Sequence, residues 1–263
     1  QAAEERFDLR LRPLLGNRRD ELVDLADDFD RMAHQLARLQ RTRQQLLHDI
    51  SHELRSPLTR LQAAVGLVRQ DSGDIPSLLD RIEREIERLD ALIEELLTLH
   101  RLEAEAKSPR EKVDVQELLQ AVVEDASFEA QASGRSVHLQ ANAPYVTEVH
   151  GEMLCRALDN VIRNAVKFSP PGGRVDVQTR VSLEEGLWQC QVLDRGPGVP
   201  EDMLEAIFQP FTRVPGADKV PGTGLGLAIA WRAMQLHGGQ ITARLRRGGG
   251  LVVTLSLPRV QEA

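Results

Sequence analysis

The sequence has 263 residues, of which 41% are hydrophobic and only 3% aromatic, so it is long enough for two domains with aliphatic cores. Its formal net charge of −7, with no long basic stretch, argues against a nucleic-acid binder. No apolar run approaches the ~20 residues that a transmembrane helix needs, so we expect this part of the chain to be soluble. Cys155 and Cys190 stand far apart inside apolar patterns, which favours buried free thiols over a disulfide.

The N-terminal part divides into a connector and a repeat. Residues 1–20 contain Pro13 and the turn signal Gly16-Asn17, which predict an extended connector. A heptad repeat follows, in which apolar residues recur at alternating steps of three and four, interrupted only at Arg43. We expect two chains to pair here as a parallel coiled coil that continues into the next helix; a single amphipathic helix packed on its own domain is the alternative. The apolar positions are Leu22, Leu25, Phe29, Met32, Leu36, Leu39, Leu46 and Ile50.

The most informative stretch surrounds His52. Apolar residues repeat with helical spacing on either side of it, and His52 and Ser56 stand four residues apart off that stripe, which predicts that both face solvent. Pro57 cannot donate a hydrogen bond to the carbonyl of Glu53, so the helix should bend or loosen there. A neutral imidazole can attack phosphorus while a carboxylate, that of Glu53 or Asp49, accepts its proton. For an isolated His-Glu pair, a solvated face with incidental histidines is the alternative.

A second helix is predicted after a turn. Turn-forming residues at 71–76 should end the first helix near Gln70, and Ser77 should open the second. Apolar residues follow helical spacing as far as Leu97, so each pair of antiparallel helices leaves apolar stripes that a second copy can cover in a dimeric four-helix bundle. The charged stretch 103–112 is predicted to be a linker.

Beyond the linker, the pattern alternates between strands and helices, which indicates a separate α/β domain of about 150 residues. Apolar and polar side chains alternate along Val175–Val181, as is typical of a half-buried strand. The predicted strands cover 113–115, 136–142, 174–183, 187–193, 240–246 and 250–257, and the predicted helices cover 116–132, 151–168 and 223–237.

One helix of this domain carries a polar face. Asn160, Asn164 and Lys167 recur at i, i+4 and i+7, so their side chains share one side of the helix. Neutral amide oxygens suit Mg²⁺, which takes few protein ligands, and lysine supplies a point charge for phosphate. An asparagine pair at this spacing also occurs on ordinary solvated faces.

Two further motifs are rich in glycine. Asp194 follows a strand and precedes Gly196 and Gly198, so its carboxylate can accept a hydrogen bond from a purine amine where glycines let the main chain approach. The run Gly222–Ala228 opens a helix, whose main-chain N–H groups and dipole can hold phosphate. A Rossmann fold is the alternative for such a run, but this one lies near the C-terminus and no acidic residue follows about twenty positions on after a βα unit.

The segment between these two motifs is either a mobile lid or an ordinary loop. Phe208 and Phe211 are two of only six phenylalanines in the chain. They precede a stretch rich in proline and glycine at 214–222, and they would anchor such a lid.

Ser51–Thr59 resembles the H-box of sensor histidine kinases, the bacterial two-component receptors. The four later motifs resemble, in their order, the N, G1, F and G2 boxes of the GHKL ATPase fold. Asp20–Ala33 is similar to the second helix of a HAMP linker. With the closing strands, the resemblance covers nearly the whole chain, and within the family it is most similar to the envelope-stress (Cpx-type) kinases of proteobacteria.

The resemblance implies the core of a sensor histidine kinase. In this family His52 is the phosphoacceptor that takes phosphate from ATP, with Glu53 as its general base, and passes it to an aspartate of a response regulator. Ser56, where the family more often has threonine, would help to dephosphorylate that regulator.

The resemblance also implies an ATP and Mg²⁺ site. Asn164 would be the Mg²⁺ ligand, and Arg213 and Lys219 in the lid would reach the γ-phosphate. The residues expected to contact the nucleotide are Asn160, Asn164, Lys167, Phe168, Asp194, Gly196, Gly198, Arg213, Gly222, Thr223, Gly224, Leu225 and Gly226.

The predicted fold is α+β and multidomain: a coiled coil and a helical hairpin that form a dimeric four-helix bundle, followed by an α/β sandwich that binds ATP. The expected domains are a partial HAMP linker and coiled coil at 1–40, a dimerisation and phosphotransfer hairpin at 41–105 and a catalytic domain at 113–260. The resemblance further implies a homodimer on the cytoplasmic side of the bacterial inner membrane, within a parent protein that spans it. An ATP-driven clamp and a nucleotide-binding scaffold without catalysis are the rival functions.

Overall fold

The computed structural model describes residues 21–70, 74–141, 143–182, 184, 186–216 and 222–258. The chain divides into two compact units whose boundary lies between Glu85 and Ile86, within one long helix. The predicted connector at 1–20 and the lid residue Lys219 lie outside the described residues. In the described part of the chain, every helix is too short or too polar to cross a membrane.

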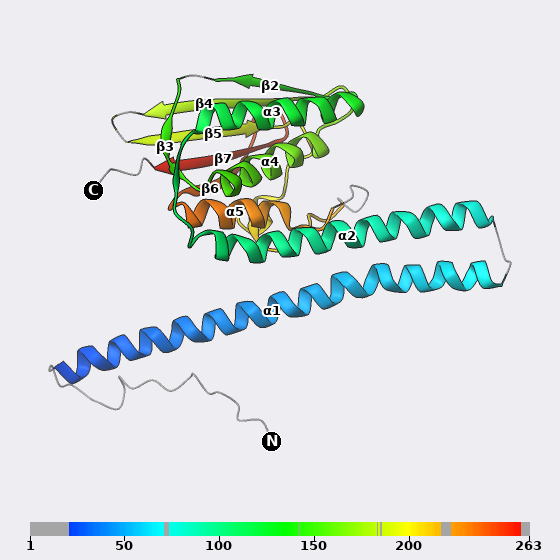
Figure 1. The fold of residues 1–263 in the computed structure, drawn as a ribbon, viewed down its shortest axis with the longest axis horizontal. Helices are drawn as coiled ribbons and strands as arrows, with labels where there is room; N and C mark the ends of the chain where they lie inside the picture. Colours follow the sequence, from blue (N-terminus) through cyan, green and yellow to red (C-terminus); the bar gives the residue numbers. More distant parts are fainter. Residues whose placement is uncertain are drawn as a thin grey trace. The chain divides into compact units, whose positions relative to one another are not determined.

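The first unit is helical (Figure 1). Helix α1 (Glu21–Arg69) is continuous for 49 residues and includes Pro57, so the disturbance expected at this residue does not end the helix. The helix ends within one residue of the predicted position. Helix α2 (Ile75–Glu105) begins two residues before the predicted Ser77, because Pro76 is tolerated in the first helical turn, where its missing N–H needs no partner.

Arg60 links α1 to the first part of α2 within this unit. Its Nε and Nη2 atoms donate to Oε1 and Oε2 of Glu85 at 2.7 and 2.8 Å. This is a bidentate contact, in which the planar guanidinium donates two hydrogen bonds to one carboxylate. The pair therefore sets the register of the two helices on the C-terminal side of the His52 stretch.

Apolar side chains of the predicted heptad repeat stay at the surface of the single chain. Phe29 is 47% exposed, Met32 57% and Leu36 53%, whereas Ala33 on the same helix is buried. Exposed apolar surface that recurs along one helix marks an interaction face. The side chains of Leu22, Leu25, Leu39 and Arg43, which also belong to the repeat, lie outside the described residues.

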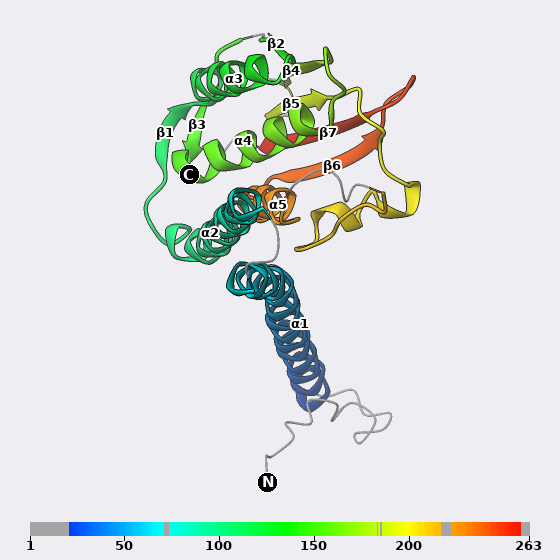
Figure 2. The same cartoon turned by 90° about the vertical axis from the view of Figure 1, so that its right-hand side faces the viewer.

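The second unit contains a five-stranded sheet with three helices along one of its faces, which confirms the predicted α/β sandwich (Figures 1 and 2). The strand order is β2-β4-β5-β7-β6; β2 runs parallel to β4, and the other neighbouring pairs are antiparallel. Strands β1 and β3 form a separate antiparallel pair. The elements are β1 (Glu111–Asp114), α3 (Val115–Ala132), β2 (Ser136–Gln140), β3 (Val146–Val149), α4 (Gly151–Phe168), β4 (Arg174–Ser182), β5 (Leu187–Leu193), α5 (Gly226–Leu236), β6 (Gln240–Leu245) and β7 (Leu251–Pro258).

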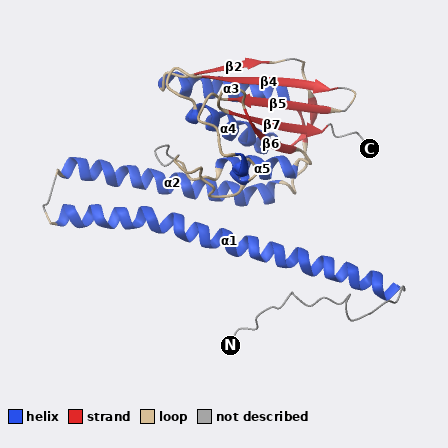
Figure 3. Cartoon of the chain, turned by 180° about the vertical axis from the view of Figure 1, so that it is seen from behind, coloured by secondary structure: helices blue, strands red, loops and turns tan. Residues whose placement is uncertain are grey.

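The core of this unit lies between the sheet and the layer formed by α3, α4 and α5 (Figure 3). Along β5, Trp188, Cys190 and Val192 are buried while their neighbours are partly exposed, the period of two expected of a strand. Leu158 and Ile162 of α4 are fully buried. The two cysteines are free, as predicted, but only Cys190 is buried, whereas Cys155 is half-buried. Burial raises the pKa of Cys190 to about 12, so this thiol packs as an apolar side chain.

The observed elements depart from the predicted ones where local pattern is weak. Strand β3 is absent from the predicted elements because Thr147 and Glu148 separate its two valines, so its sequence does not alternate between apolar and polar residues. Helix α5 begins at Gly226 rather than at 223, because Gly224 has a φ of 80°, a left-handed conformation that a right-handed helix excludes. Two short 3₁₀ turns, Glu201–Met203 and Ala206–Phe208, precede the lid segment.

Candidate functional site

His52 lies on the exposed side of α1, as predicted. The imidazole of His48 packs edge-on against that of His52, with ring centroids 4.4 Å apart and ring planes inclined by 64°. Of the two candidate bases, Asp49 accepts a hydrogen bond from Gln45 Nε2 at 2.8 Å, and Glu53 is half-buried. His52 is thus accessible to a reactant from solvent, and Asp49 and Glu53 are the carboxylates nearest to it in the sequence.

Ser56 is exposed one helical turn beyond His52, as predicted. Its Oγ atom accepts a hydrogen bond from Arg60 Nη1 at 2.6 Å. The same guanidinium is held by Glu85, so the Ser56 oxygen has a fixed partner. Sequence reasoning does not identify this chain of contacts, because Glu85 belongs to the second helix.

The second unit has a cavity of about 720 Å³ beside α4 and the N-terminus of α5. It brings together residues from all four predicted motifs. Two of the predicted residues, Leu225 and Gly196, do not line the cavity. Leu225 is fully buried, and Gly196 donates its N–H to Asp194. Apolar side chains outside the predicted set also line the wall, among them Val199, Ile207, Leu227 and Leu251. The predicted residues on the wall are Asn160, Asn164, Lys167, Phe168, Asp194, Gly198, Arg213, Gly222, Thr223, Gly224 and Gly226.

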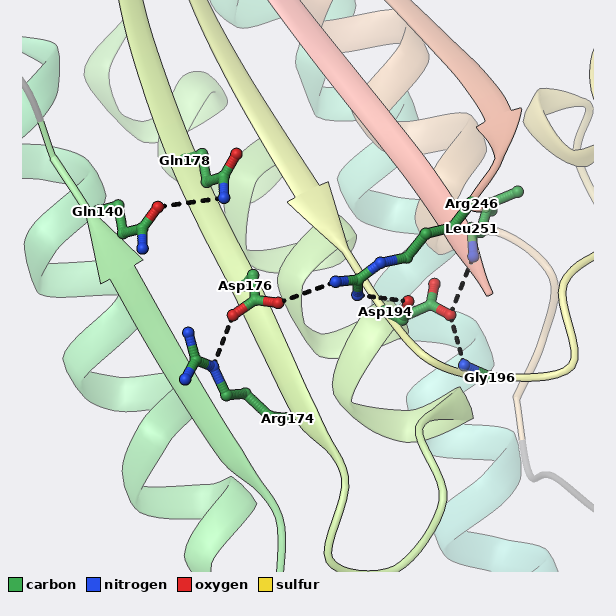
Figure 4. Close-up of polar contacts among 8 residues, drawn as sticks. All are labelled: Gln140, Arg174, Asp176, Gln178, Asp194, Gly196, Arg246 and Leu251. Atoms are coloured by element: carbon green, nitrogen blue, oxygen red, sulfur yellow. Dashed lines mark hydrogen bonds and ion pairs between the residues drawn. The ribbon is translucent and has the colours of Figure 1, made fainter. Parts of the chain in front are cut away.

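Asp194 stands one residue past the end of β5 and is only 6% exposed. Its Oδ1 atom accepts hydrogen bonds from the main-chain N–H groups of Gly196 at 2.7 Å and Leu251 at 3.1 Å (Figure 4). Burial raises the pKa of Asp194 above its ordinary value, although these hydrogen bonds and the Arg246 cation oppose the rise. Because both main-chain donors use Oδ1, the Oδ2 atom is left for a ligand that carries an amine.

A glycine-rich loop leads into α5. A Cβ atom on Gly224 would lie 2.9 Å from the main chain of Phe211, so this position has no room for a side chain. One on Gly226 would lie 2.8 Å from Asn160 Oδ1, so the Asn160 amide would have to move. Phe211 itself has a φ of 61°, which is uncommon for a residue with a side chain and often marks a functional segment. The close packing places the first N–H groups of α5 at the cavity, where they lack intrahelical partners.

Opposite charges meet on the cavity wall. Glu95, from the part of α2 in the second unit, lines the cavity and accepts a hydrogen bond from the Thr223 hydroxyl. Burial raises the pKa of Glu95, against this hydrogen bond and the attraction of Lys167. Burial likewise lowers the pKa of Lys167, against the attraction of Glu95. Sequence reasoning misses Glu95, because it stands in a helix rich in glutamate where no local signal marks one as inward-facing.

The chemistry of this cavity suits a purine nucleotide. A carboxylate oxygen can accept a hydrogen bond from an amine of the base, and apolar side chains can pack against the ring. Lysine and the N-terminus of a helix both bind phosphate.

Comparisons with protein families agree with the exposed histidine on α1 and with the nucleotide cavity of the second unit. Residues 42–105 match the His Kinase A (phospho-acceptor) domain, and residues 150–261 match the histidine kinase-, DNA gyrase B-, and HSP90-like ATPase domain. The chain belongs to the sensor histidine kinases. The sensor histidine kinase CpxA of Escherichia coli (strain K12) is 36% identical over 253 residues, which cover 95% of this chain and 54% of CpxA. This sensor-kinase chain therefore spans about half the length of the curated relatives it matches.

Solved structures of sensor kinases share the fold. Full-length ShkA, crystallised in complex with AMPPNP, is 27% identical to this chain, and the match covers 83% of this chain and 46% of ShkA with a TM-score of 0.59. The histidine kinase ThkA, in complex with the response regulator protein TrrA, matches 86% of this chain and 66% of ThkA with a TM-score of 0.67. Its sequence identity is 19%, so this second likeness concerns the fold alone.

Proposed function

We propose that this sensor-kinase chain is the core of an ATP-dependent protein-histidine kinase that phosphorylates itself on His52. The observation that carries the proposal is the combination, in one chain, of an exposed histidine within a phospho-acceptor helix and a cavity lined by all four nucleotide-binding motifs. The related ShkA was crystallised with AMPPNP, an ATP analogue, which supports ATP as the ligand of this cavity.

In the proposed complex, each end of ATP has its own partners. The adenine amine donates a hydrogen bond to Asp194, and Phe168 packs near the base. Lys167 and the loop Gly222–Gly226 hold the phosphates through the ammonium and main-chain N–H groups. Arg213, on the lid segment, approaches the γ-phosphate.

The residues on the cavity wall also fit a Mg²⁺ ion. Asn164 is half-buried on the face of α4 that carries Asn160 and Lys167, and an amide oxygen is a suitable ligand for this hard cation. Within the described residues, no three His, Cys, Asp or Glu side chains gather to hold a metal. The proposed site therefore relies on Asn164 and on phosphate oxygens, an arrangement that Mg²⁺ commonly uses. When bound, Mg²⁺ would neutralise part of the phosphate charge.

The proposed reaction has two steps. The imidazole of His52 attacks the γ-phosphorus of ATP, the bond to the ADP oxygen breaks, and Glu53 takes the proton that the ring loses. An oxygen of an aspartate carboxylate on a response regulator then attacks the phosphorus. The new P–O bond forms as the P–N bond to His52 breaks, and the ring takes back a proton from Glu53, which restores neutral imidazole. The complex of ThkA with TrrA supports a response regulator as the partner of this fold.

We propose that Ser56 takes part in a second activity, the dephosphorylation of the regulator. Its hydroxyl is exposed one turn from His52, and Arg60 holds the oxygen in place. A hydroxyl that is held in this way can position a water molecule for attack on an aspartyl phosphate.

We also propose that two copies pair along α1 and α2, as the cytoplasmic part of a membrane-anchored receptor. A bundle of two hairpins would bury the apolar side chains that each copy leaves exposed. In this arrangement residues 1–40 end a HAMP linker, 41–105 form the bundle and 113–260 form the catalytic domain. The exposed side chains are Phe29, Met32, Leu36, Leu47, Leu58, Val65 and Leu67 on α1 and Ile75, Leu79, Ile86, Ile93 and Leu97 on α2.

Incubation of the purified chain with γ-labelled ATP and Mg²⁺ tests the proposed function. We expect labelled protein whose label is lost in acid, as a phosphorylated histidine requires, and moves to a receiver domain when one is added. Release of labelled phosphate without labelled protein would indicate a plain ATPase instead.

In the same assay, Ser56→Ala should keep the label on the kinase but dephosphorylate a phosphorylated receiver domain at least about tenfold more slowly.

Glu95→Gln is expected to bind ADP about tenfold more tightly than the wild type. The Glu95 carboxylate lies on the wall of the proposed nucleotide cavity, where it repels phosphates and competes with them for Lys167. Isothermal titration calorimetry measures the change. Glu94→Gln is the matched control, because the Glu94 side chain is exposed. Equal or weaker binding of ADP by Glu95→Gln would contradict this prediction.

A further inference from the structure

We infer that Arg246 and Asp176 are positioning residues for base recognition: they hold the main chain at Asp194 so that its carboxylate selects adenine over guanine. The inference rests on the proposed binding of a nucleotide in this cavity. It adds two residues that lie outside the four nucleotide-binding motifs.

One guanidinium joins the ends of two strands. Arg246 Nη1 donates to the main-chain oxygen of Asp194 at 2.9 Å, and Nη2 donates to Oδ2 of Asp176 on β4 at 3.1 Å (Figure 4). The side chain of Arg246 is 19% exposed and that of Asp176 is 10% exposed. A planar guanidinium that is largely buried between two acceptors has little freedom to reorient.

Asp176 is itself held in place. Its Oδ1 atom accepts a hydrogen bond from Arg174 Nε at 2.6 Å, and it pairs in register with Leu193, the residue before Asp194. Burial opposes the ionised form of Asp176, but the hydrogen bonds from Arg174 and Arg246 outweigh this effect and lower its pKa. Asp176 therefore remains a negative charge that keeps Arg246 directed at the end of β5.

The turn between β6 and β7 is shaped for this contact. Gly250 has a φ of 103°, and a Cβ atom there would lie 2.3 Å from the main-chain oxygen of Asp194, so a side chain at this position would push the turn away. The Arg246 N–H donates to Gly250 O at 3.0 Å and closes the turn. The turn thus brings two donors to Asp194, the Arg246 guanidinium to its carbonyl and the Leu251 N–H to its Oδ1 atom.

Asp194, held in this way, offers one acceptor to the cavity. Within the described part of the chain, Oδ1 receives both main-chain N–H groups and Oδ2 receives none. Adenine carries an amine donor at its 6-position, whereas guanine carries a carbonyl acceptor there. A carboxylate oxygen held opposite this position attracts the first and repels the second. If the main chain at Asp194 could shift, the carboxylate could turn away from guanine and part of the discrimination would be lost.

Binding of ADP and GDP to the full chain, measured by calorimetry, tests this assignment. The wild type should prefer ADP. In Arg246→Met, we expect the affinity for ADP to fall about tenfold while the affinity for GDP stays the same, so the preference shrinks. Arg246→Lys keeps the charge and one donor and should recover part of the preference. Arg247→Met is the matched control, because Arg247 is exposed in the same turn, and it should behave as the wild type.

Competition by tripolyphosphate separates contacts to the base from contacts to the phosphates, and its affinity should be equal in the wild type and in Arg246→Met. Asp176→Asn removes the charge that holds Arg246 without changing the shape of the side chain. Asp176→Asn should reduce the preference for ADP over GDP, but by less than Arg246→Met does. If Arg246→Met does not fold, Asp176→Asn still tests the inference.

Two results would overturn this inference but leave the proposed function intact. One is a wild-type ratio of ADP to GDP affinity in both Arg246→Met and Asp176→Asn. The other is an equal loss of affinity for ADP, GDP and tripolyphosphate, which would indicate a general effect on the fold. A wild type that binds neither nucleotide would refute the proposed function, and the inference would fall with it.

Discussion

His52→Ala is expected to lose all acid-labile phosphorylation, a decrease of more than about a thousandfold. The imidazole is the proposed nucleophile, and alanine offers no group that can replace it. Because His52 is exposed on α1, its loss should change the free energy of unfolding by less than about 0.5 kcal/mol. ADP should bind the variant as it binds the wild type, since the cavity belongs to the other unit. Labelling with γ-labelled ATP, before and after acid treatment, measures the effect.

His48→Ala is the matched control for this substitution. His48 lies one helical turn away and its ring packs against that of His52, so both variants remove an imidazole from the same surface. We expect His48→Ala to retain its label within about threefold of the wild type. Full labelling of His52→Ala would contradict the assignment of the acceptor.

Asp194→Asn is expected to weaken ADP binding about a hundredfold. Asparagine has the same shape, and its oxygen can still accept the N–H groups of Gly196 and Leu251 that now bond Oδ1. Its amide nitrogen then replaces Oδ2 and presents a donor to the donor amine of adenine. Calorimetry measures the loss, and the thermal midpoint of unfolding shows whether the fold is kept. Wild-type affinity in this variant would contradict the role of Asp194 in base recognition.

The same site predicts a dependence on pH. Burial raises the pKa of Asp194, so its acceptor form, present above that pKa, is lost at a higher pH than in an exposed aspartate. Wild-type affinity for ADP should therefore fall on acidification, while the weak binding of Asp194→Asn should not share this fall. Asp202→Asn, which changes an exposed carboxyl and keeps Asp194, is the control and should show the same fall as the wild type. Any fall that remains in Asp194→Asn reports titration of the nucleotide or of other groups.

Local patterns in the sequence identified about half of the residues that line the cavity. Asn160, Asn164 and Lys167 share one face in any helix that covers 151–168, and α4 has these bounds. Glycines mark the places where the main chain takes a positive φ or passes close to a neighbour, as at Gly224. Such signals depend only on residues close together in the chain, so 11 of the 23 described residues on the cavity wall could be predicted before the fold was known.

Only the tertiary structure decided which charged residues meet. Arg246 and Asp176 are 70 residues apart in the sequence, and Glu95 and Thr223 are 128 apart. An arginine or glutamate in a charged stretch has the same local pattern whether it faces solvent or a cavity. The burial and hydrogen bonds that distinguish them arise from the register of the sheet and from turns that join distant strands. The sequence therefore identified Asp194, but the packing of the domain determined which of its two oxygens is left to meet a ligand.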